Sequence, residues 1–364
     1  MKVLLINVVC GGGSTGRICL ELANEFKTNG DEVKIAYGRG GVPDTSKKYA
    51  IHIGNSIDQK FHFLKTRLWD EHGLGSVNET KKFIKWADDY DPDLVWIHNI
   101  HGYYINYELL FQWIKSKPDM QVRWTLHDCW AFTGHCAYFT KVACEKWMKE
   151  CNRCTQKRSY PSSIFIDRSR TNYYRKKAAF TGVNNLTIIT PSRWLANLVK
   201  ESFLGEYEIR VMYNKINKQI FRNVESSIKN DYNMVDKKMI LGVANIWDSR
   251  KGFDDFLKLS YLLDKKSFIM LVGLSDKQIR KLPSNVIGIK KTRDVQELVR
   301  IYSAADVFFN PTYEDNYPTV NLEAEACGTK VVTYNTGGAP ETIHRFDSKV
   351  IPVGHFEEVL KYID

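Results

Sequence analysis

Apolar, β-type runs alternate with helix-like segments along the whole chain. The strand-like runs of the first half are KVLLINV, EVKIAYG, DLVWIHN, VRWTLHD and LTIITPS, and those of the second half are MILGVAN, FIMLVGL, NVIGIKK, DVFFNPT and KVVTYNT. The segment RICLELANEFKTNG predicts an amphipathic helix that Gly30 would cap. Such alternation predicts parallel sheets in α/β layers, with ligand sites in the loops at the carboxyl ends of strands.

A polar stretch interrupts this alternation after EIRVMYN and continues to MVDKK. We therefore predict two domains, residues 1–212 and 213–364. Two Rossmann-like units with parallel sheets, facing one another across a cleft, would bury a ligand the size of a nucleotide.

The composition is that of a soluble globular protein, with 43% hydrophobic and 26% charged residues. No apolar run approaches the ~20 residues of a membrane span. The N-terminal VLLINVV is short and runs into Gly11-Gly12-Gly13, which favours a first strand over a signal peptide. We expect a cytoplasmic protein.

Positive charge is concentrated in one segment of this chain, whose net charge is +10. Between Lys141 and Lys177 stand eleven basic and three acidic residues, with aromatic residues between them. This segment is either a solvated basic face or a contact for an anionic membrane or a phosphorylated substrate, since each basic residue near acidic lipid gains about 1 kcal/mol. No nucleic-acid motif accompanies it, so we favour membrane or phosphate and expect no nucleic acid as a partner.

The stretch PTYEDNYPTVNLEAEACGTKVVTYNTGGAPE (311–341) predicts a polar ligand site. Glu314, Asp315 and Asn316 follow a strand, and Glu323 lies about two turns further on, in a helix. The apolar positions of that helix, Leu322, Ala326 and Val320, are expected to face inward.

Two other loops carry candidate phosphate contacts. Arg250 and Lys251 follow the first strand of the second half, where two cations suit the oxygens of a diphosphate. The loop CGGGSTGR (Cys10–Arg17) is either a tight strand-to-helix turn or a phosphate or sugar contact at a helix N-terminus. An NAD site is disfavoured because AYGRGG, after the second strand, lacks the expected acid.

Five of the eight cysteines fall within residues 129–154. Clustered thiols in a cytosolic chain favour a metal over disulfides. We predict a structural zinc held by Cys136, Cys144, Cys151 and Cys154, with Cys129 and His135 as substitutes. Unligated cysteines are the alternative.

Several motifs together resemble one enzyme family. They are GGGSTG, PDLVWIHNIHG, TLHD, TPSRWL, VMYNKIN, RKGF and EDNYPT…LEAEACGTKVV…GGAPE. With them the chain resembles retaining glycosyltransferases of family 4, which have the GT-B fold. Through TRLWDEHGLGS, HNIHGYYIN and HDCWAFTGHC it is similar to the colanic-acid and capsule branch.

The resemblance implies transfer of a hexose from a nucleoside-diphosphate sugar, with retention, during surface polysaccharide synthesis. Residues 213–364 would bind the nucleotide sugar, and residues 1–212, with a cysteine-rich basic excursion at 129–177, would bind a saccharide or lipid-pyrophosphate-linked acceptor. Catalysis would need no metal or other cofactor. The basic 141–177 segment would hold the enzyme at the anionic inner face of the cell membrane.

The resemblance also implies residue roles. Catalytic roles fall to His127, Arg250, Lys251, Glu314 and Asp315. Donor contacts fall to Gly13, Ser14, Thr15, Gly16, Asn245, Asn316, Tyr317, Pro318, Thr319 and Glu323, and acceptor contacts to His98, His101 and Arg67.

Two positions depart from the family pattern. The family separates its paired glutamates by seven residues, a spacing that Asp315 and Glu323 keep, whereas Glu314 and Glu323 have eight between them. Either acid could therefore fill the first role. Asn245 stands where the family has an arginine, and Arg250 would supply that charge instead.

Rival functions remain open at this point. One is a sugar-nucleotide epimerase of the same fold, and another is a zinc-stabilised protein that binds nucleic acid or membrane. Asp89-Tyr90-Asp91 has the spacing of a metal-binding D-x-D, but we expect a solvated turn. The chain ends 23 residues after Glu341, at a predicted short helix HFEEVLKYI, so either this branch closes differently or the sequence is shortened.

Overall fold

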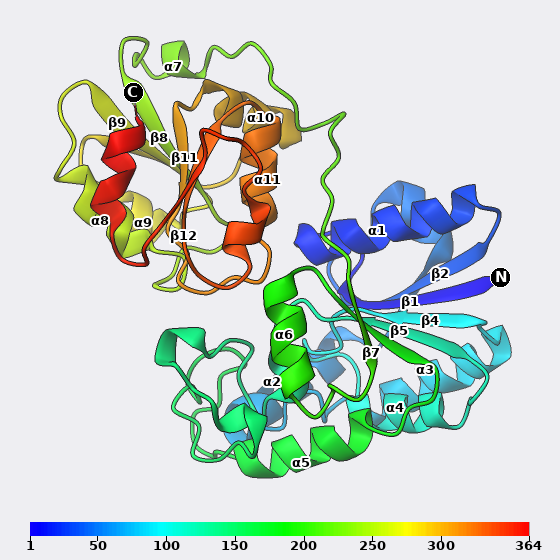
Figure 1. The fold of residues 1–364 in the computed structure, drawn as a ribbon. Helices are drawn as coiled ribbons and strands as arrows, with labels where there is room; N and C mark the ends of the chain where they lie inside the picture. The colour runs from blue at the N-terminus through cyan, green and yellow to red at the C-terminus, as the bar shows by residue number, and fades with distance from the viewer. Residues whose placement is uncertain (364) are drawn as a thin grey trace. The chain divides into compact units, whose positions relative to one another are not determined.

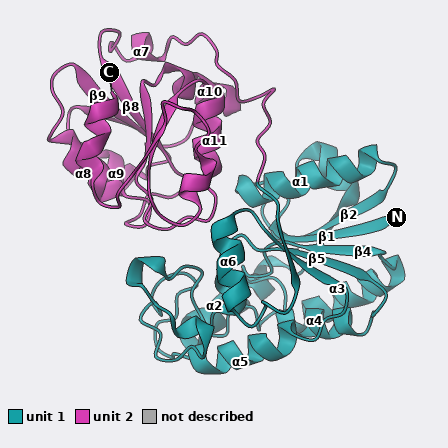
Figure 2. Ribbon diagram, viewed as in Figure 1, with its two compact units in different colours: residues 1–213 teal, residues 214–364 magenta. Residues whose placement is uncertain are grey.

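The computed structural model describes residues 1–363. The chain divides into two units, residues 1–213 and residues 214–364 (Figure 2). The predicted boundary lies one residue from this division. The predicted linker belongs to the second unit, where it carries the one-turn helix α7 (Ile228–Asp231).

The first unit is built on a seven-stranded sheet in the order β3-β2-β1-β4-β5-β6-β7, with every pairing parallel (Figure 1). Its strands are β1 (Lys2–Val9), β2 (Glu32–Arg39), β3 (Ala50–His52), β4 (Leu94–Ile97), β5 (Gln121–Thr125), β6 (Leu186–Thr190) and β7 (Glu208–Val211). In this register Ile6 on β1 pairs with Ala36 on one side and Ile97 on the other. Chain order reverses at β1, so the loops after β1 and β4 diverge there.

Helices connect these strands. They are α1 (Gly13–Thr28), α2 (Ser56–Trp69), α3 (Val77–Tyr90), α4 (Tyr107–Lys115), α5 (Ser169–Phe180) and α6 (Arg193–Glu201), with 3₁₀ turns η1 (Asp44–Tyr49), η2 (Trp130–Phe132), η3 (Thr140–Val142) and η4 (Lys146–Met148). The last three turns lie in the cysteine-rich segment, defined here as residues 129–168. The D-x-D lies at the end of α3 rather than in the predicted solvated turn: Asp89 and the buried Tyr90 belong to the helix, and Asp91 ends it with φ 51°.

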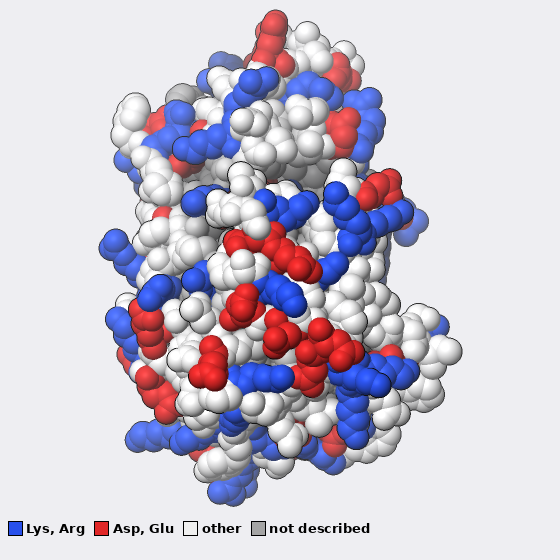
Figure 3. Space-filling model, turned by 90° about the vertical axis from the view of Figure 1, so that its right-hand side faces the viewer, with Lys and Arg blue, Asp and Glu red and all other residues white. Residues whose placement is uncertain are grey.

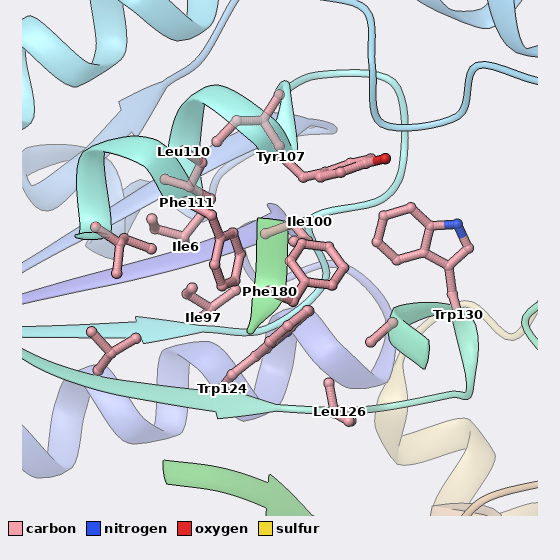
Figure 4. Packing of buried hydrophobic residues seen from close by; sticks show 14 of the residues in the cluster. Ile6, Ile97, Ile100, Tyr107, Leu110, Phe111, Trp124, Leu126, Trp130 and Phe180 are labelled. Carbon is pink, nitrogen blue, oxygen red and sulfur yellow. The ribbon is translucent and has the colours of Figure 1, made fainter. Parts of the chain in front are cut away.

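The core of the first unit is centred on aromatic side chains from β5, α4 and α5 (Figure 4). Phe180 is fully buried, and its ring centroid lies 4.6 Å from that of Phe111 and 4.8 Å from that of Trp124. Tyr107 and Trp130 extend this cluster toward the carboxyl end of β5. Packing of this kind holds the loops after β4 and β5 on a rigid base.

The second unit repeats the same design with six parallel strands in the order β10-β9-β8-β11-β12-β13. The strands are β8 (Lys238–Val243), β9 (Ser267–Val272), β10 (Val286–Ile289), β11 (Val307–Asn310), β12 (Lys330–Tyr334) and β13 (Lys349–Ile351). The remaining helices are α8 (Phe253–Ser260), α9 (Asp276–Ile279), α10 (Val295–Ala304) and α11 (Thr319–Ala326), with 3₁₀ turns η5 (Ala339–Thr342) and η6 (Phe356–Tyr362). Its reversal lies between β8 and β11.

Two parallel α/β sheets confirm the predicted fold class, and every strand-like run of the sequence forms a strand. The short strands β3, β7 and β13 were not predicted. The predicted short helix at HFEEVLKYI is present as the 3₁₀ helix η6. How the two sheets face one another stays a prediction. Within residues 1–363 we find no helix with the length and apolarity needed to cross a membrane.

Candidate active site

The loops after β8 and β11 are bonded to each other at the point where strand order reverses. Arg250 donates from Nη1 to the carbonyl of Glu314 at 2.8 Å, and its own carbonyl accepts from the amide of Tyr313 at 2.8 Å. Gly252 permits this approach, since its φ is 71° and a Cβ there would lie 2.3 Å from the carbonyl oxygen of Pro311. Only glycine tolerates that combination.

Opposite charges meet across these two loops. The ammonium of Lys251 pairs with the carboxylate of Asp315, and the two side chains are 20% and 14% exposed. The other oxygen of Asp315 accepts from the amide of Asn316 at 2.9 Å. The structure thus brings the predicted cations and the predicted acid loop together at the carboxyl end of the sheet.

A glycine pair after β12 supports the acid loop. Gly337 has φ 55°, and a Cβ at this position would lie 1.9 Å from the carbonyl oxygen of Asp315. Gly338 donates its amide to the same oxygen at 3.2 Å. This contact gives the GGAPE motif a physical reason: its glycines hold the backbone of the acid loop.

Helix α11 turns polar residues inward, and the sequence prediction for its apolar positions is confirmed only in part: Val320 and Ala326 pack against the core, whereas Leu322 is not among the residues of that core. All three are only half-buried, whereas the buried positions are Asn321, Glu323 and Ala324. Asn321 accepts from Asn310 and donates to Thr342, both at 2.8 Å.

Glu323 is 3% exposed, and its carboxylate accepts from the hydroxyl of Tyr302 at 3.1 Å. Hydrogen-bond partners therefore outweigh apolarity in choosing the buried face of α11. The other predicted donor contacts precede this helix. Asn316 and Tyr317 are buried, Pro318 stands at the N-cap, and Thr319 begins α11.

A cavity of about 700 Å³ opens at the carboxyl ends of β8, β9 and β10, a size typical of small-ligand sites. Its lining comprises Asn245, Ile246, Trp247, Phe253, Leu257, Gly273, Leu274, Ser275, Lys277, Gln278, Lys281 and Lys290. Asn245 was predicted, but the three lysines were not. Gly273 is the residue that could have indicated this cavity from the sequence, because its φ of 100° lets the chain turn tightly against the carbonyl oxygen of Ala244.

The first unit brings together two predicted histidines at the ends of β4 and β5. Nδ1 of His98 lies 3.0 Å from Nε2 of His127, and the rings stack with centroids 5.3 Å apart. Burial lowers the pKa of His98 well below its ordinary value and that of His127 to about 4. Both imidazoles are therefore neutral at pH 7.

His101 lies beside this pair and makes two polar contacts of its own. Its Nε2 lies 3.0 Å from Oδ2 of Asp128, and its Nδ1 lies 3.0 Å from the hydroxyl of Tyr160. Burial of Asp128 favours its neutral form, but His101 and the amide of Trp130 outweigh burial and hold the pKa of this carboxyl below its usual value. Asp128 and Tyr160 were missed by the sequence analysis.

The remaining predicted residues of the first unit lie elsewhere. Gly13 and Ser14 are exposed at the N-terminus of α1, with Thr15 half-buried and Gly16 packed against the backbone of Gly11. Arg67 lies on α2, where its guanidinium is 5.7 Å from the ring centroid of Phe63. It is absent from the lining of the small cavity at His98 and His101, so the structure does not group it with them.

The basic segment 141–177 presents less free positive charge than its sequence suggests. Lys176 is buried, and three arginines pair with carboxylates: Arg168 with Glu71, Arg170 with Glu150, and Arg175 with Glu108. Figure 3 views the molecule from the right-hand side of Figure 1, away from residues 129–168, and on that face acidic and basic side chains are intermingled.

Comparison with known proteins identifies relatives of the chain. Residues 237–363 match the family model described as glycosyl transferases group 1. Over its full length the chain is 24% identical to the Escherichia coli (strain K12) protein assigned to colanic acid biosynthesis as the glycosyl transferase WcaC, and the match covers 89% of that protein. A D-inositol 3-phosphate glycosyltransferase of Corynebacterium jeikeium is 43% identical over 72 residues, which are 20% of this chain and 17% of that protein.

Solved structures share the fold over all or nearly all of the chain. Sucrose-phosphate synthase of Thermosynechococcus elongatus aligns with a TM-score of 0.70 at 17% identity and covers 100% of this chain and 88% of its own. HepE of Anabaena, in complex with UDP, aligns at 0.66 with 14% identity, covering 100% and 89%. WaaG, a glycosyltransferase involved in lipopolysaccharide biosynthesis, aligns at 0.61 with 15% identity, covering 99% and 90%.

The buried histidine pair predicts a pH dependence of stability. Because the folded pKa of His127, about 4, lies below its ordinary value of 6.5, the unfolded chain binds the proton first as pH falls. The contribution of the neutral His127 to the unfolding free energy is therefore fully present above pH 6.5, and this contribution is lost as the pH falls from 6.5 to 4. We expect the unfolding free energy of the first unit to fall less between pH 7.5 and pH 5 in His127→Gln than in the wild type, as measured by urea unfolding.

His52→Gln is the matched control, since His52 is exposed on β3 of the same unit, and it should keep the wild-type pH slope. An unchanged slope in His127→Gln would contradict the assignment of a depressed pKa to this ring.

Proposed function

Because the chain carries a group 1 glycosyltransferase domain and shares its fold with GT-B enzymes, we propose that it transfers a hexose from a nucleoside-diphosphate sugar to a saccharide acceptor, with retention at the anomeric carbon. One observation carries the proposal. Arg250 and Lys251 are held against the acid loop at the strand-order reversal, beside a cavity of nucleotide size. Its relative WcaC supports a role in surface polysaccharide synthesis.

The donor would lie along the carboxyl end of the second sheet. The cavity at β8, β9 and β10 suits the nucleoside, and Lys277, Lys281 and Lys290 add positive charge at its wall. The structural neighbour HepE has been solved with UDP and with UDP-glucose, which supports this class of donor.

Lys251 and Arg250 would stabilise the departing diphosphate. In the structure Lys251 is paired with Asp315, so phosphate oxygens entering the site would compete for its ammonium. The carboxylate of Asp315 would then accept from a hydroxyl of the sugar. Preorganised cations can serve a diphosphate leaving group without a metal ion, and we propose that this enzyme works in that way.

The geometry favours Asp315 over Glu314 for the first acid role. Glu314 is 4% exposed and its carbonyl anchors Arg250, whereas Asp315 directs its carboxylate to the phosphate-binding lysine. Glu323 would accept from the ribose, since a carboxylate has lone pairs beyond the one that Tyr302 occupies.

The acceptor would bind the first unit at the histidine cluster. His98 and His127 are neutral at pH 7, so their rings can exchange hydrogen bonds with sugar hydroxyls without placing a charge among them. His101, held by Asp128 and Tyr160, would extend this surface.

A lipid-linked acceptor is supported by an exposed apolar surface on the same unit. Ile57, Phe61 and Leu64 recur along one face of α2 and are 65%, 67% and 46% exposed. Residues 164–166 continue this surface, since the amide of Ile164 donates to the carbonyl of Arg67 at 2.8 Å. We call these residues the α2 patch.

Basic residues Lys60, Lys65 and Arg67 lie on the same helix as the α2 patch. Apolar and basic groups on one helix suit the interface of an anionic membrane. We therefore propose that the α2 patch, rather than the whole of residues 141–177, meets the membrane at its cytoplasmic face.

The donor assignment is tested by thermal unfolding with UDP-, GDP-, ADP- and dTDP-sugars. We expect one series to raise the melting temperature of the second unit, since a ligand at 100 times its Kd stabilises by about 2.7 kcal/mol. With that donor, Lys251→Ala should lower kcat by roughly 10²–10³, the scale of one preorganised electrostatic contact. Release of the nucleoside diphosphate is the assay.

Lys265→Ala is the control, because Lys265 is an exposed lysine of the same unit outside this site. Near-normal turnover in Lys251→Ala would contradict the placement of the diphosphate at this position. If none of the four series of sugar nucleotides raised the melting temperature, the proposed donor class would be wrong.

Membrane binding is tested by co-sedimentation with vesicles that contain phosphatidylglycerol. Replacing Phe61 and Leu64 together by serine should weaken partitioning at least tenfold, because burying each apolar side chain contributes about 1.5–3 kcal/mol. Tyr261→Ser, at a residue of the second unit that is 80% exposed, should bind as the wild type does. Equal partitioning of the double variant would rule out the α2 patch as the contact.

A further inference from the structure

The cysteine-rich segment folds with very little regular structure of its own. Among its described residues the helices are three 3₁₀ turns of three residues each, η2, η3 and η4 (Figure 1). Even so, Cys136, Trp147 and Cys151 are 6%, 2% and 8% exposed. With so little regular structure, the segment depends on turns and side-chain contacts to hold its fold.

Four thiols of the segment line one small cavity. Cys136, Cys144, Cys151 and Cys154 share it with Thr133, His135, Phe139, Lys146, Trp147 and Asn152. The thiols of Cys136 and Cys154 are hydrogen-bonded to each other, and the amide of Gly134 donates to the sulfur of Cys151 at 3.2 Å. The cysteines thus gather from 19 residues of sequence around one space.

These side chains do not yet converge on a single point. Within residues 1–363 no three His, Cys, Asp or Glu side chains are already spaced to hold one metal ion. Cys144 and Cys154 are only half-buried and lie in loops, so rotation about χ1 and a small loop shift can move their sulfurs inward.

His135 gives an independent indication of a ligand in this cavity. The residue is 2% exposed, and its Nδ1 lies 2.5 Å from Oδ1 of the buried Asp70. The other oxygen of Asp70 accepts from the amide of Arg168 at 2.8 Å, which fixes the carboxylate. Nε2 of His135 has no hydrogen-bond partner among the described residues.

An orphaned nitrogen of this kind needs an explanation. A buried polar group without a partner destabilises the fold. A group that occupies the cavity would complete the hydrogen bonds of His135.

A buried cation also lies beside the thiols. Lys176 is 1% exposed, and its ammonium donates to the carbonyls of Trp130 at 2.6 Å and Thr133 at 3.0 Å. It also interacts with Cys151 and Cys136, two of the four cysteines that line the cavity.

We infer that the cavity is a structural zinc centre, with the thiolates of Cys136, Cys144, Cys151 and Cys154 as its four ligands and His135 as a positioning residue that donates from Nε2 to a thiolate. Zinc prefers tetrahedral sulfur coordination at about 2.3 Å. Binding of Zn²⁺ by four thiols releases four protons and leaves a centre of charge −2 close to the buried side chain of Lys176. No oxidant or reductant is involved.

The centre would support the histidine cluster of the first unit. Tyr160, which bonds to His101 at 3.0 Å, belongs to the segment that the zinc would hold. Lys176 connects α5 to η2, where Trp130 packs against the aromatic core. The zinc would therefore act on folding and positioning, and the inference is independent of the donor proposed above.

Metal analysis of untagged protein, purified without chelator from cells supplied with zinc, tests the inference. We expect about one zinc per chain. Changing Cys151 and Cys154 together to serine should reduce zinc to less than one-fifth of that amount, whereas the pair Cys19→Ser and Cys327→Ser, at two buried cysteines outside the cavity, should leave it unchanged.

His135→Gln should keep the stoichiometry but weaken zinc affinity by about 10–100-fold, as loss of an outer-shell partner does. If the His135→Gln variant lost stoichiometric zinc, His135 would be a ligand, and its assignment as a positioning residue would be wrong. Limited proteolysis provides a readout without variants: removal of zinc should expose residues 133–168 to cleavage, and its return should restore protection.

Three results would overturn the centre itself. They are substoichiometric zinc in the wild type with four reactive native thiols, wild-type zinc content in the double serine variant, and a disulfide between Cys136 and Cys154.

Discussion

The parallel direction of every paired strand in both sheets is the constraint on which the candidate sites depend. It brings all carboxyl ends of a sheet to one edge. Because strand order reverses between β8 and β11, the loops that follow these two neighbouring strands begin side by side and continue to opposite faces of the sheet. At Gly252 those loops come so close that no side chain fits between them. A backbone bond from Tyr313 to Arg250, and a bond from the Arg250 side chain to the carbonyl of Glu314, then hold the two loops together.

The partly buried ion pair between Lys251 and Asp315 contributes little to stability and is suited to ligand binding. An ion pair between Lys251 and Asp315, whose side chains are 20% and 14% exposed, gains modest energy after desolvation, so its presence is better explained by function than by stability. Lys251 can exchange Asp315 for a phosphate, which is also anionic, and Asp315 can then accept from a neutral hydroxyl. A diphosphate and a sugar hydroxyl could therefore replace the internal pair with little rearrangement, which is the preorganisation that electrostatic catalysis requires.

Local pattern predicts the elements of this chain far better than it predicts contacts between them. The strand-like runs, the acid loop and the two cations were all identified from spacing. The buried face of α11 was not, because Asn321 and Glu323 are buried by bonds to Thr342 and Tyr302, partners outside the helix. The cavity lysines were missed for the same reason, since Lys277 and Lys290 come together only when β9 and β10 pair.

The first unit extends this argument to segments without regular structure. Cysteine spacing could identify which thiols gather, but the bond between His135 and Asp70 spans 65 residues and joins the cysteine-rich segment to the end of α2. The amide of Ile164 is held by Arg67, near the other end of that segment. One segment thus touches the helix that presents the α2 patch and, through Tyr160, the histidine cluster. Any factor that orders it would therefore act on the proposed membrane contact and the proposed acceptor site together.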